Sequence, residues 1–100
     1  MKDFPNDHPF SIYNKNLYID SGTWEMPIYI FKFDNKGVLV ECHLNDTING
    51  PHCRLYDVDF PDDYDFKLVR SFTELFASSK NDLFLKAVAA IERRIRSNGE

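Results

Sequence analysis

The chain has 100 residues, of which 43% are hydrophobic and 15% aromatic, and its 12 basic and 16 acidic side chains leave a net charge of −4. This length predicts a single domain over residues 1–100, with enough apolar surface to fold without disulfides or bound metal. No apolar run approaches the roughly 20 residues of a membrane span, and residues 1–9 lack the basic and apolar segments of a secretory signal. We therefore expect a cytoplasmic protein with no membrane partner, in which Cys42 and Cys53 are reduced thiols.

Charge is distributed unevenly along the chain. Residues 1–65 carry 12 acidic and 5 basic side chains, a net charge of −7, whereas residues 66–100 carry 4 acidic and 7 basic side chains, a net charge of +3. The acidic body argues against nucleic acid bound over the whole surface, and it suits a basic protein partner.

The first half of the chain predicts strands. Residues 1–9 contain two prolines and predict an extended N-terminal arm. Short apolar runs at residues 10–13 and 17–20 flank an Asn-rich turn, which is typical of a hairpin. Residues 26–45 predict a second hairpin, because apolar side chains alternate on both sides of a turn that ends in Gly37, a residue suited to a positive φ.

The second half predicts a further strand and then helices. Residues 53–58 predict the strand, and the Pro- and Asp-rich residues 60–65 predict a loop. A capping box, Ser71-Phe72-Thr73-Glu74, predicts a short helix, and a longer amphipathic helix follows from a cap at Ser79 or Asn81. The predicted fold class is α+β, an antiparallel β-meander of four to five strands followed by two C-terminal helices packed on one sheet face.

The pairs Cys42-His43 and His52-Cys53 are mirror images around a turn, which raises a zinc hypothesis. If the two strands pair with Cys42 opposite Cys53, both thiols lie on one face of the sheet and both imidazoles on the other. Four ligands then cannot converge on one ion, although a one-residue slip in register would mix Cys with His on each face. We predict structural thiols, surface histidines, no metal site and no cofactor.

An acidic segment with neighbouring aromatic residues is the predicted partner-binding site. Five aspartates lie within nine residues, with no basic residue among them. They could bind a divalent cation, attract a basic partner or form a solvated loop, and the pattern of a calcium-binding loop is absent from the sequence. Exposed aromatic side chains nearby would anchor a partner. The predicted binding residues are Asp57, Asp59, Asp62, Asp63, Tyr64, Asp65, Trp24 and Tyr56.

Three arginines, Arg93, Arg94 and Arg96, lie near the end of the last predicted helix. They could bind phosphate, or they could complement the helix dipole. The sequence contains no Gly-x-Ser-x-Gly motif, no phosphate-binding glycine loop and no His-Glu-x-x-His motif, so we expect no enzyme and no catalytic residue.

The order of predicted elements over residues 27–76 resembles the C-terminal half of the SUKH superfamily of bacterial toxin-immunity proteins. The matching residues, Ser71-Phe72-Thr73-Glu74-Leu75-Phe76, correspond to the Ser-Phe-x-x-Phe/Leu start of the family's helix. The resemblance does not extend to the family's N-terminal helical region. It implies an immunity-type function, and no binding residue is carried over from it.

The predicted function is that of a small acidic inhibitor of the immunity or antitoxin type, which neutralises a basic toxin or enzyme by occluding its surface. The alternative is a nucleic-acid-binding accessory protein that uses the basic C-terminal helix. Nucleic acid is the less expected partner. We expect a monomer or a homodimer, since an exposed sheet edge commonly pairs with a second copy.

Overall fold

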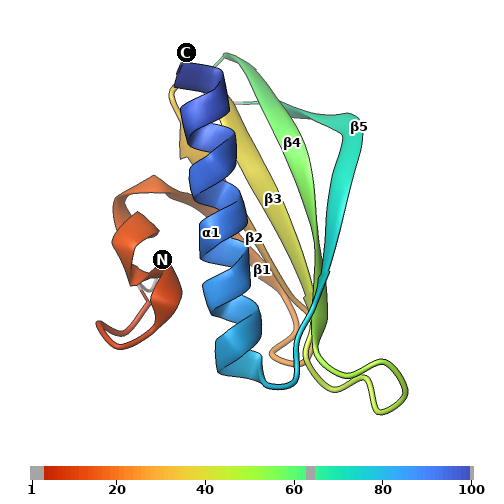
Figure 1. Ribbon diagram of the computed structural model, residues 1–100. Helices are drawn as coiled ribbons and strands as arrows, with labels where there is room; N and C mark the ends of the chain where they lie inside the picture. Colours follow the sequence, from red (N-terminus) through yellow and green to blue (C-terminus); the bar gives the residue numbers. More distant parts are fainter. Residues whose placement is uncertain (1–3, 63–64, 100) are drawn as a thin grey trace.

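The computed structural model describes the backbone of residues 4–62 and 65–99, and the side chains of residues 4–62, 65–69 and 72–96 (Figure 1). The strands form one antiparallel sheet in chain order, β1-β2-β3-β4-β5. The predicted α+β class is confirmed. The elements are the 3-10 helix η1 (Pro9–Asn16), the strands β1 (Leu17–Gly22), β2 (Pro27–Phe33), β3 (Lys36–His43), β4 (His52–Asp62) and β5 (Asp65–Phe76), and the helix α1 (Lys80–Gly99).

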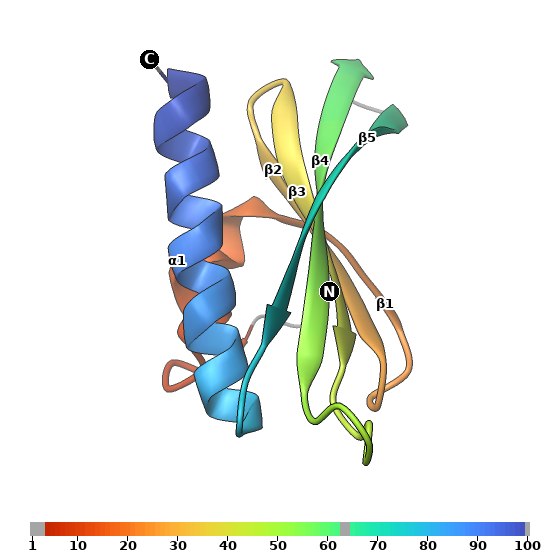
Figure 2. The same ribbon diagram turned by 45° about the vertical axis from the view of Figure 1, so that its right-hand side comes forward.

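The sheet has one face covered by helix and one face without it. Helix α1 and the shorter η1 lie against the same face, which we call the inner face, and no described helix lies on the opposite, outer face (Figures 1 and 2). Side chains from the inner face, η1 and α1 form the main core. Its buried members are Phe10, Tyr13, Phe31, Val38, Val40, Cys42, Cys53, Leu55, Leu83, Ala87, Ala90 and Ile91.

Helix α1 begins directly after Ser79, one of the two residues that the sequence predicts as its N-cap. The Ser79 Oγ accepts a hydrogen bond from the backbone N–H of Asp82 at 3.1 Å, so Ser79 is the N-cap. Four buried side chains recur at helical spacing and confirm the predicted amphipathic helix, namely Leu83, Ala87, Ala90 and Ile91. No helix in the described part of the chain is long and apolar enough to span a membrane.

The prediction of a first C-terminal helix is wrong, because the capping-box residues belong to β5. This strand pairs with β4 from His52↔Phe76 to Asp62↔Asp65, so the described residues of the predicted loop, 60–62 and 65, are strand. Phe72 and Phe76 are four residues apart, a spacing that puts two side chains on one side of a helix and equally on one face of a strand. Pairing with β4 gives residues 72–76 cross-strand partners in register and places Phe72 and Phe76 together on one face of the sheet.

Residues 10–13 form part of η1, so the prediction of a first strand there is also wrong. Pro9 occupies the start of the 3-10 helix, where its missing N–H costs no hydrogen bond. His8 caps it, because the His8 Nδ1 accepts a hydrogen bond from the Phe10 N–H at 3.0 Å. Phe10 and Tyr13 are buried and Ile12 is exposed, a spacing of three that fits a 3-10 helix.

The described part of the predicted extended arm is folded against the core. Residues 6–7 make a turn, and the backbone of Phe4 exchanges two hydrogen bonds with the Asn14 side chain, at 2.8 and 3.1 Å. The Phe4 ring lies 4.9 Å from that of Tyr29, centroid to centroid. Aromatic burial therefore holds this segment in place.

The hairpin at residues 26–45 is confirmed, but Gly37 has a different role from the predicted one. The positive φ of the turn, 59°, falls on Asp34. Gly37 lies in β3 beneath the ring of Phe60, and a Cβ there would stand 2.7 Å from the Phe60 Cε2 and nearer still to the carbonyl oxygen of Phe31. Glycine at this position allows the end of β4 to fold over the outer face.

The imidazole of His8 is enclosed by aromatic rings. Its centroid lies 4.7 Å from that of Phe4 and 4.5 Å from that of Phe84. Burial lowers the pKa of His8 below its usual 6.5, and the neighbouring Asp7 carboxylate offsets part of this change. Protonation would also remove the acceptor that caps η1, since the Nδ1 lone pair accepts the Phe10 N–H.

We expect the free energy of unfolding to fall as the pH is lowered through 6.5, and this decline to level off below the pKa of His8 in the folded state. In that window the unfolded chain binds a proton that the folded chain does not. Urea unfolding at a series of pH values measures the effect. The control is His8→Asn, which keeps a cap acceptor and does not titrate. Equal pH dependence in both proteins would contradict this role of His8.

Candidate partner-binding face

The outer face of the sheet divides into a covered half and an open half. Toward β1 and the β2–β3 turn, Ile30, Val58 and Phe60 form a second buried cluster, with Tyr18 and Phe66 packed against it. The other half lies over β3, β4 and β5, where strand register arranges the side chains in rows. The open face consists of the rows Leu39–Tyr56–Phe72, Glu41–Arg54–Glu74 and His43–His52–Phe76, together with Leu68.

A shallow hollow lies on the open face between β4 and β5. It has a volume of about 440 Å³, and Arg54, Tyr56, Leu68, Val69 and Phe72 line it. The rings of Tyr56 and Phe72 are 5.7 Å apart. Phe72 is 55% exposed although it is a large apolar side chain. Adjacent exposed apolar side chains of this kind are typical of interaction surfaces.

The guanidinium of Arg54 is held in position on this face. Its Nε donates to the Glu74 Oε2 at 3.0 Å, across the β4–β5 pairing. Hydrogen bonds with Glu74 and with Tyr56 raise the pKa of Arg54 above its already high usual value. A planar guanidinium of this kind can bind a carboxylate or stack on an aromatic ring of a partner.

A stack of three rings continues the open face. His43 and His52 lie 4.8 Å apart with their planes 9° from parallel, and Phe76 lies 5.4 Å from His52. The Nε2 of His43 lies 3.0 Å from the Glu41 carboxylate. Phe76 is 49% exposed, whereas His52 is 9% exposed between its two neighbours, so the prediction of a surface histidine is wrong for His52.

The predicted register of the Cys-His strands is confirmed. Cys42 pairs with Cys53 and His43 with His52, so the thiols lie on the inner face and the imidazoles on the outer face. Both thiols are fully buried, and burial raises the pKa of Cys53 to about 12 and raises that of Cys42 further. Among the described residues no group of three His, Cys, Asp or Glu side chains could hold a metal ion.

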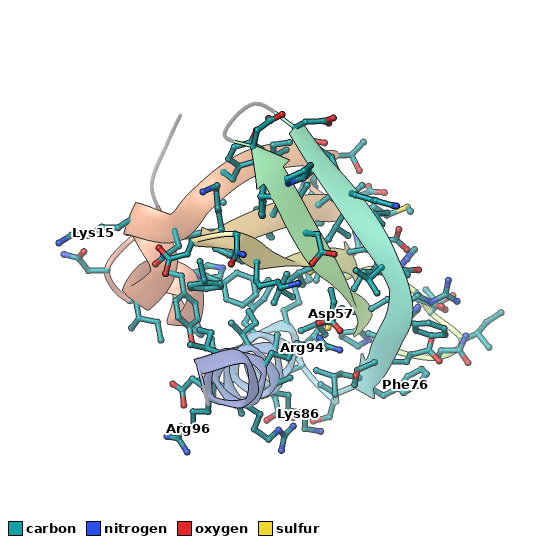
Figure 3. All side chains as sticks on the ribbon, turned by 90° about the horizontal axis from the view of Figure 1, so that it is seen from above. Lys15, Asp57, Phe76, Lys86, Arg94 and Arg96 are labelled. Carbon is teal, nitrogen blue, oxygen red and sulfur yellow. The ribbon has the colours of Figure 1, made fainter. Side chains whose placement is uncertain are left out.

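The structure divides the predicted aspartates between different environments. The Asp57 Oδ1 accepts from the Arg94 Nε at 3.0 Å, between β4 and α1 (Figure 3). Asp59 accepts from the Lys36 Nζ at 2.7 Å. Asp62 and Asp65 are exposed neighbours at the end of the β4–β5 hairpin, and Asp63 and Tyr64 lie outside the described residues.

The two predicted aromatic anchors lie apart. Tyr56 lines the hollow of the open face. Trp24 is 77% exposed in the β1–β2 turn, where the Lys80 Nζ lies 5.8 Å from its ring centroid. This turn and the acidic β4–β5 hairpin are at opposite ends of the meander, so Trp24 does not join the acidic residues.

Sequence reasoning missed Arg54, Leu68 and Phe72 as site residues. The signal was present as alternation, because Phe66, Leu68 and Phe72 occupy even-numbered positions that share one face of a strand. The helical interpretation of residues 71–76 concealed it.

The three C-terminal arginines do not form one basic patch. The Arg94 side chain turns toward the sheet, where its NH2 group donates to the Thr73 Oγ1 at 2.9 Å in addition to the pair with Asp57. Arg93 and Arg96 remain exposed on α1. The surface available to a phosphate backbone is therefore smaller than the sequence indicates.

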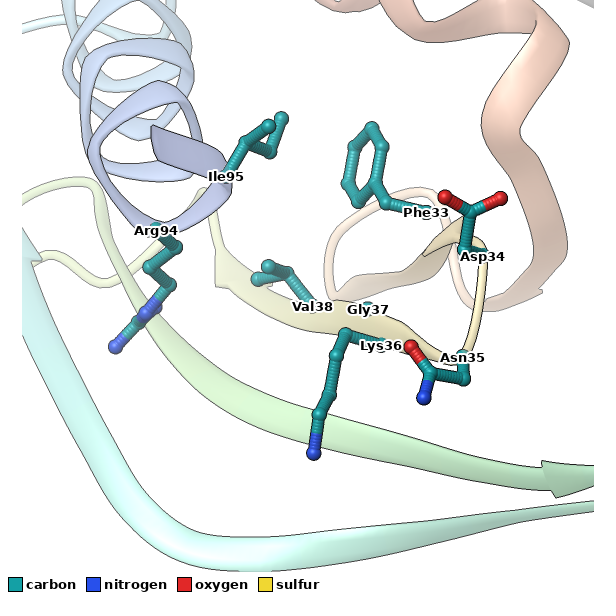
Figure 4. A pocket seen from close by; sticks show the side chains of 8 residues that line it. All are labelled: Phe33, Asp34, Asn35, Lys36, Gly37, Val38, Arg94 and Ile95. Carbon is teal, nitrogen blue, oxygen red and sulfur yellow. The ribbon is translucent and has the colours of Figure 1, made fainter. Parts of the chain in front are cut away.

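A small cavity lies between the C-terminal end of α1 and the β2–β3 turn (Figure 4). Phe33, Val38 and Ile95 give it an apolar wall, and its cations, Lys36 and Arg94, are already paired with aspartates of β4. Its volume is about 180 Å³, below the roughly 300–1,000 Å³ of most ligand sites. We assign no ligand to it.

We expect Asp57→Asn to lower the free energy of unfolding by about 1–2 kcal/mol, because it leaves the largely buried Arg94 without its carboxylate partner. Asp20→Asn, at an exposed carboxylate of β1, is the control and should change stability by less than about 0.5 kcal/mol. Urea unfolding measures both. Equal stability of the two variants would show that the Asp57–Arg94 pair does not hold α1 to the sheet.

No protein-family model, curated protein or solved structure matches this chain. The segment that carries the resemblance to the SUKH superfamily, residues 71–76, is a strand rather than the start of a helix. Functional inference therefore depends on the surface of the molecule.

Proposed function

We propose that this chain is a small acidic binding protein of the inhibitor or immunity type, which occludes the surface of a basic toxin or enzyme with its open face. The observation that carries the proposal is the group of three large apolar side chains left about half exposed on one face of β5, namely Leu68, Phe72 and Phe76. Burying such surface against a partner is favourable in proportion to its apolar area.

The centre of the open face has the residue types that dominate protein–protein binding energies. Arginine and tyrosine are enriched among hot-spot residues, and Arg54 and Tyr56 occupy adjacent rows beside the hollow. The hydrogen bond from Arg54 to Glu74 orders the guanidinium before a partner arrives. Less conformational entropy is then lost when the complex forms.

Charge at the end of the β4–β5 hairpin supports a basic partner. Asp62 and Asp65 are exposed and stand opposite each other across the strand pair. Acidic residues at the end of an apolar face would accelerate encounter with a basic surface.

Tyr56→Ala is expected to weaken partner binding by about 2 kcal/mol, roughly 30-fold in Kd, since tyrosine at the centre of an interface is a common hot spot. The partner is first identified by affinity capture with the tagged chain in the presence of nuclease, and Kd is then measured by titration calorimetry. The matched control is Leu85→Ala, a half-exposed apolar residue on α1. Equal Kd for wild type and Tyr56→Ala, or capture of nucleic acid alone, would contradict the proposal.

The double variant Asp62→Asn, Asp65→Asn should associate with the same partner more slowly and with a weaker dependence on salt, while its dissociation rate changes little. Exposed charges act mainly on the association rate. Surface plasmon resonance at several ionic strengths separates the two rates. An unchanged association rate would show that the acidic hairpin does not contribute to partner binding, and that the apolar face alone determines it.

A further inference from the structure

The two cysteines of the chain stand opposite each other in the main core. Cys42 lies on β3 and Cys53 is its cross-strand partner on β4, with both side chains fully buried on the inner face and both thiols free. Two thiols on facing residues can be joined by a disulfide if the backbone brings them close enough. The separation depends on which kind of cross-strand pair the two residues form.

Hydrogen bonding between β3 and β4 identifies the kind of pair. Pairs in an antiparallel sheet alternate between hydrogen-bonded pairs and non-hydrogen-bonded pairs, and side chains are closer in the second kind. The Phe60 N–H donates to the Asn35 carbonyl at 2.9 Å, which makes these residues a hydrogen-bonded pair at one end of the ladder. The ladder has no shift in register, and Cys42 lies an odd number of residues after Asn35. Cys42 and Cys53 are therefore a non-hydrogen-bonded pair.

Hydrogen bonds to the two outer neighbours of these strands agree with this assignment. The Leu44 N–H donates to a carbonyl of the β1–β2 turn at 3.0 Å, so the backbone groups of Cys42, two residues earlier, point toward β2. The Ala77 N–H donates to the Pro51 carbonyl at 3.0 Å, so those of Cys53, two residues after Pro51, point toward β5. The backbone groups of the two cysteines point away from each other, as a non-hydrogen-bonded pair requires.

We infer that Cys42 and Cys53 form an oxidation site, which hydrogen peroxide converts into a disulfide between β3 and β4. The Cα atoms of a non-hydrogen-bonded pair are about 4.5 Å apart, within the roughly 4.4–6.8 Å that disulfides span. The Cβ atoms are about 4.5 Å apart in the closest such pairs, at the upper end of the roughly 3.5–4.5 Å seen in disulfides. The bond therefore forms without a change in strand register.

The reaction consumes one hydrogen peroxide for two thiols. One thiolate attacks a peroxide oxygen, so that an S–O bond forms, the O–O bond breaks, and the hydroxide that leaves takes up a proton to give water. The second thiol attacks the sulfur of the resulting sulfenic acid. The S–S bond then forms, the S–O bond breaks, and the hydroxyl leaves with the thiol proton as a second water. The two thiols are oxidised, and the peroxide is reduced to water.

Burial controls the rate of this reaction. It raises the pKa of both thiols, and the closed core exposes neither sulfur to solvent. Local opening of the core exposes the thiols and returns their pKa toward the usual range. The site is therefore oxidised slowly in the folded chain, and faster where opening is favoured. This inference goes beyond the proposed function, because it concerns the inner face of the strands whose outer face is the candidate partner site.

Peptide mapping of the purified full chain after exposure to hydrogen peroxide tests the inference. Trypsin cleaves after Lys36 and after Arg54, so both cysteines fall in one peptide, which contains no methionine. We expect this peptide to become lighter by two hydrogen atoms and to resist alkylation, and to recover both reactive thiols with dithiothreitol. Urea below the unfolding transition should accelerate the reaction severalfold, because it favours opening.

The matched control exchanges two residues of β3 and keeps the composition of the core. The variant Val40→Cys, Cys42→Val moves one thiol two positions along the same buried face. The moved thiol is then diagonal to Cys53, about 7–8 Å away, and should form roughly tenfold less intramolecular disulfide than the wild type. Circular dichroism checks that the variant is folded.

Three results would contradict the inference, and the first of them needs no variant. Peroxide that gives the wild type only sulfinic acids, or only dimers linked between chains, would overturn the oxidation site. Equal disulfide formation in the wild type and in the folded exchange variant would show that the facing positions on β3 and β4 do not direct the reaction. A rate that urea leaves unchanged would contradict its control by opening of the core.

Discussion

A five-stranded sheet has two faces, and the described residues form one α-helix to cover them. Helix α1, with η1 beside it, closes the inner face through small and branched side chains at helical spacing. The outer face is covered only where the sheet folds onto itself, as Phe60 packs over Gly37 and against Tyr18. This cover includes Phe66 at the start of β5 but leaves Leu68, Phe72 and Phe76 about half exposed. The open face is the apolar surface that remains, and the proposed function depends on it.

Strand β4 connects the core to the surface. Because side chains alternate along a strand, its odd-numbered residues face α1 and its even-numbered residues face outward. Leu55 is buried and Asp57 is paired with Arg94 on the inner side, while Arg54 and Tyr56 form the hollow on the outer side. The same strand that docks the helix therefore displays the candidate site, which gives the site a rigid support.

Much of the fold could be predicted because its patterns are unambiguous. The hairpin at 26–45 has sustained alternation, the pairing of Cys42 with Cys53 follows from it, and α1 has a long apolar stripe with a cap. Residues 71–76 could not be assigned in this way, because their apolar spacing fits a helix and a strand equally well. The outcome depended on β4, which pairs with each of residues 72–76 in register.

The sequence by itself determined the α+β class, the central hairpin, the last helix and the acidic character of the first 65 residues, because periodicity and charge are properties of neighbouring residues. Only the tertiary structure decided which face of the sheet the helix covers and which side chains remain exposed. Asp57 and Asp62 look alike in the sequence, yet one is paired with α1 and the other lies at the hairpin end. Their separation comes from contacts between residues far apart in the chain, and such contacts cannot be inferred from the pattern of neighbouring residues.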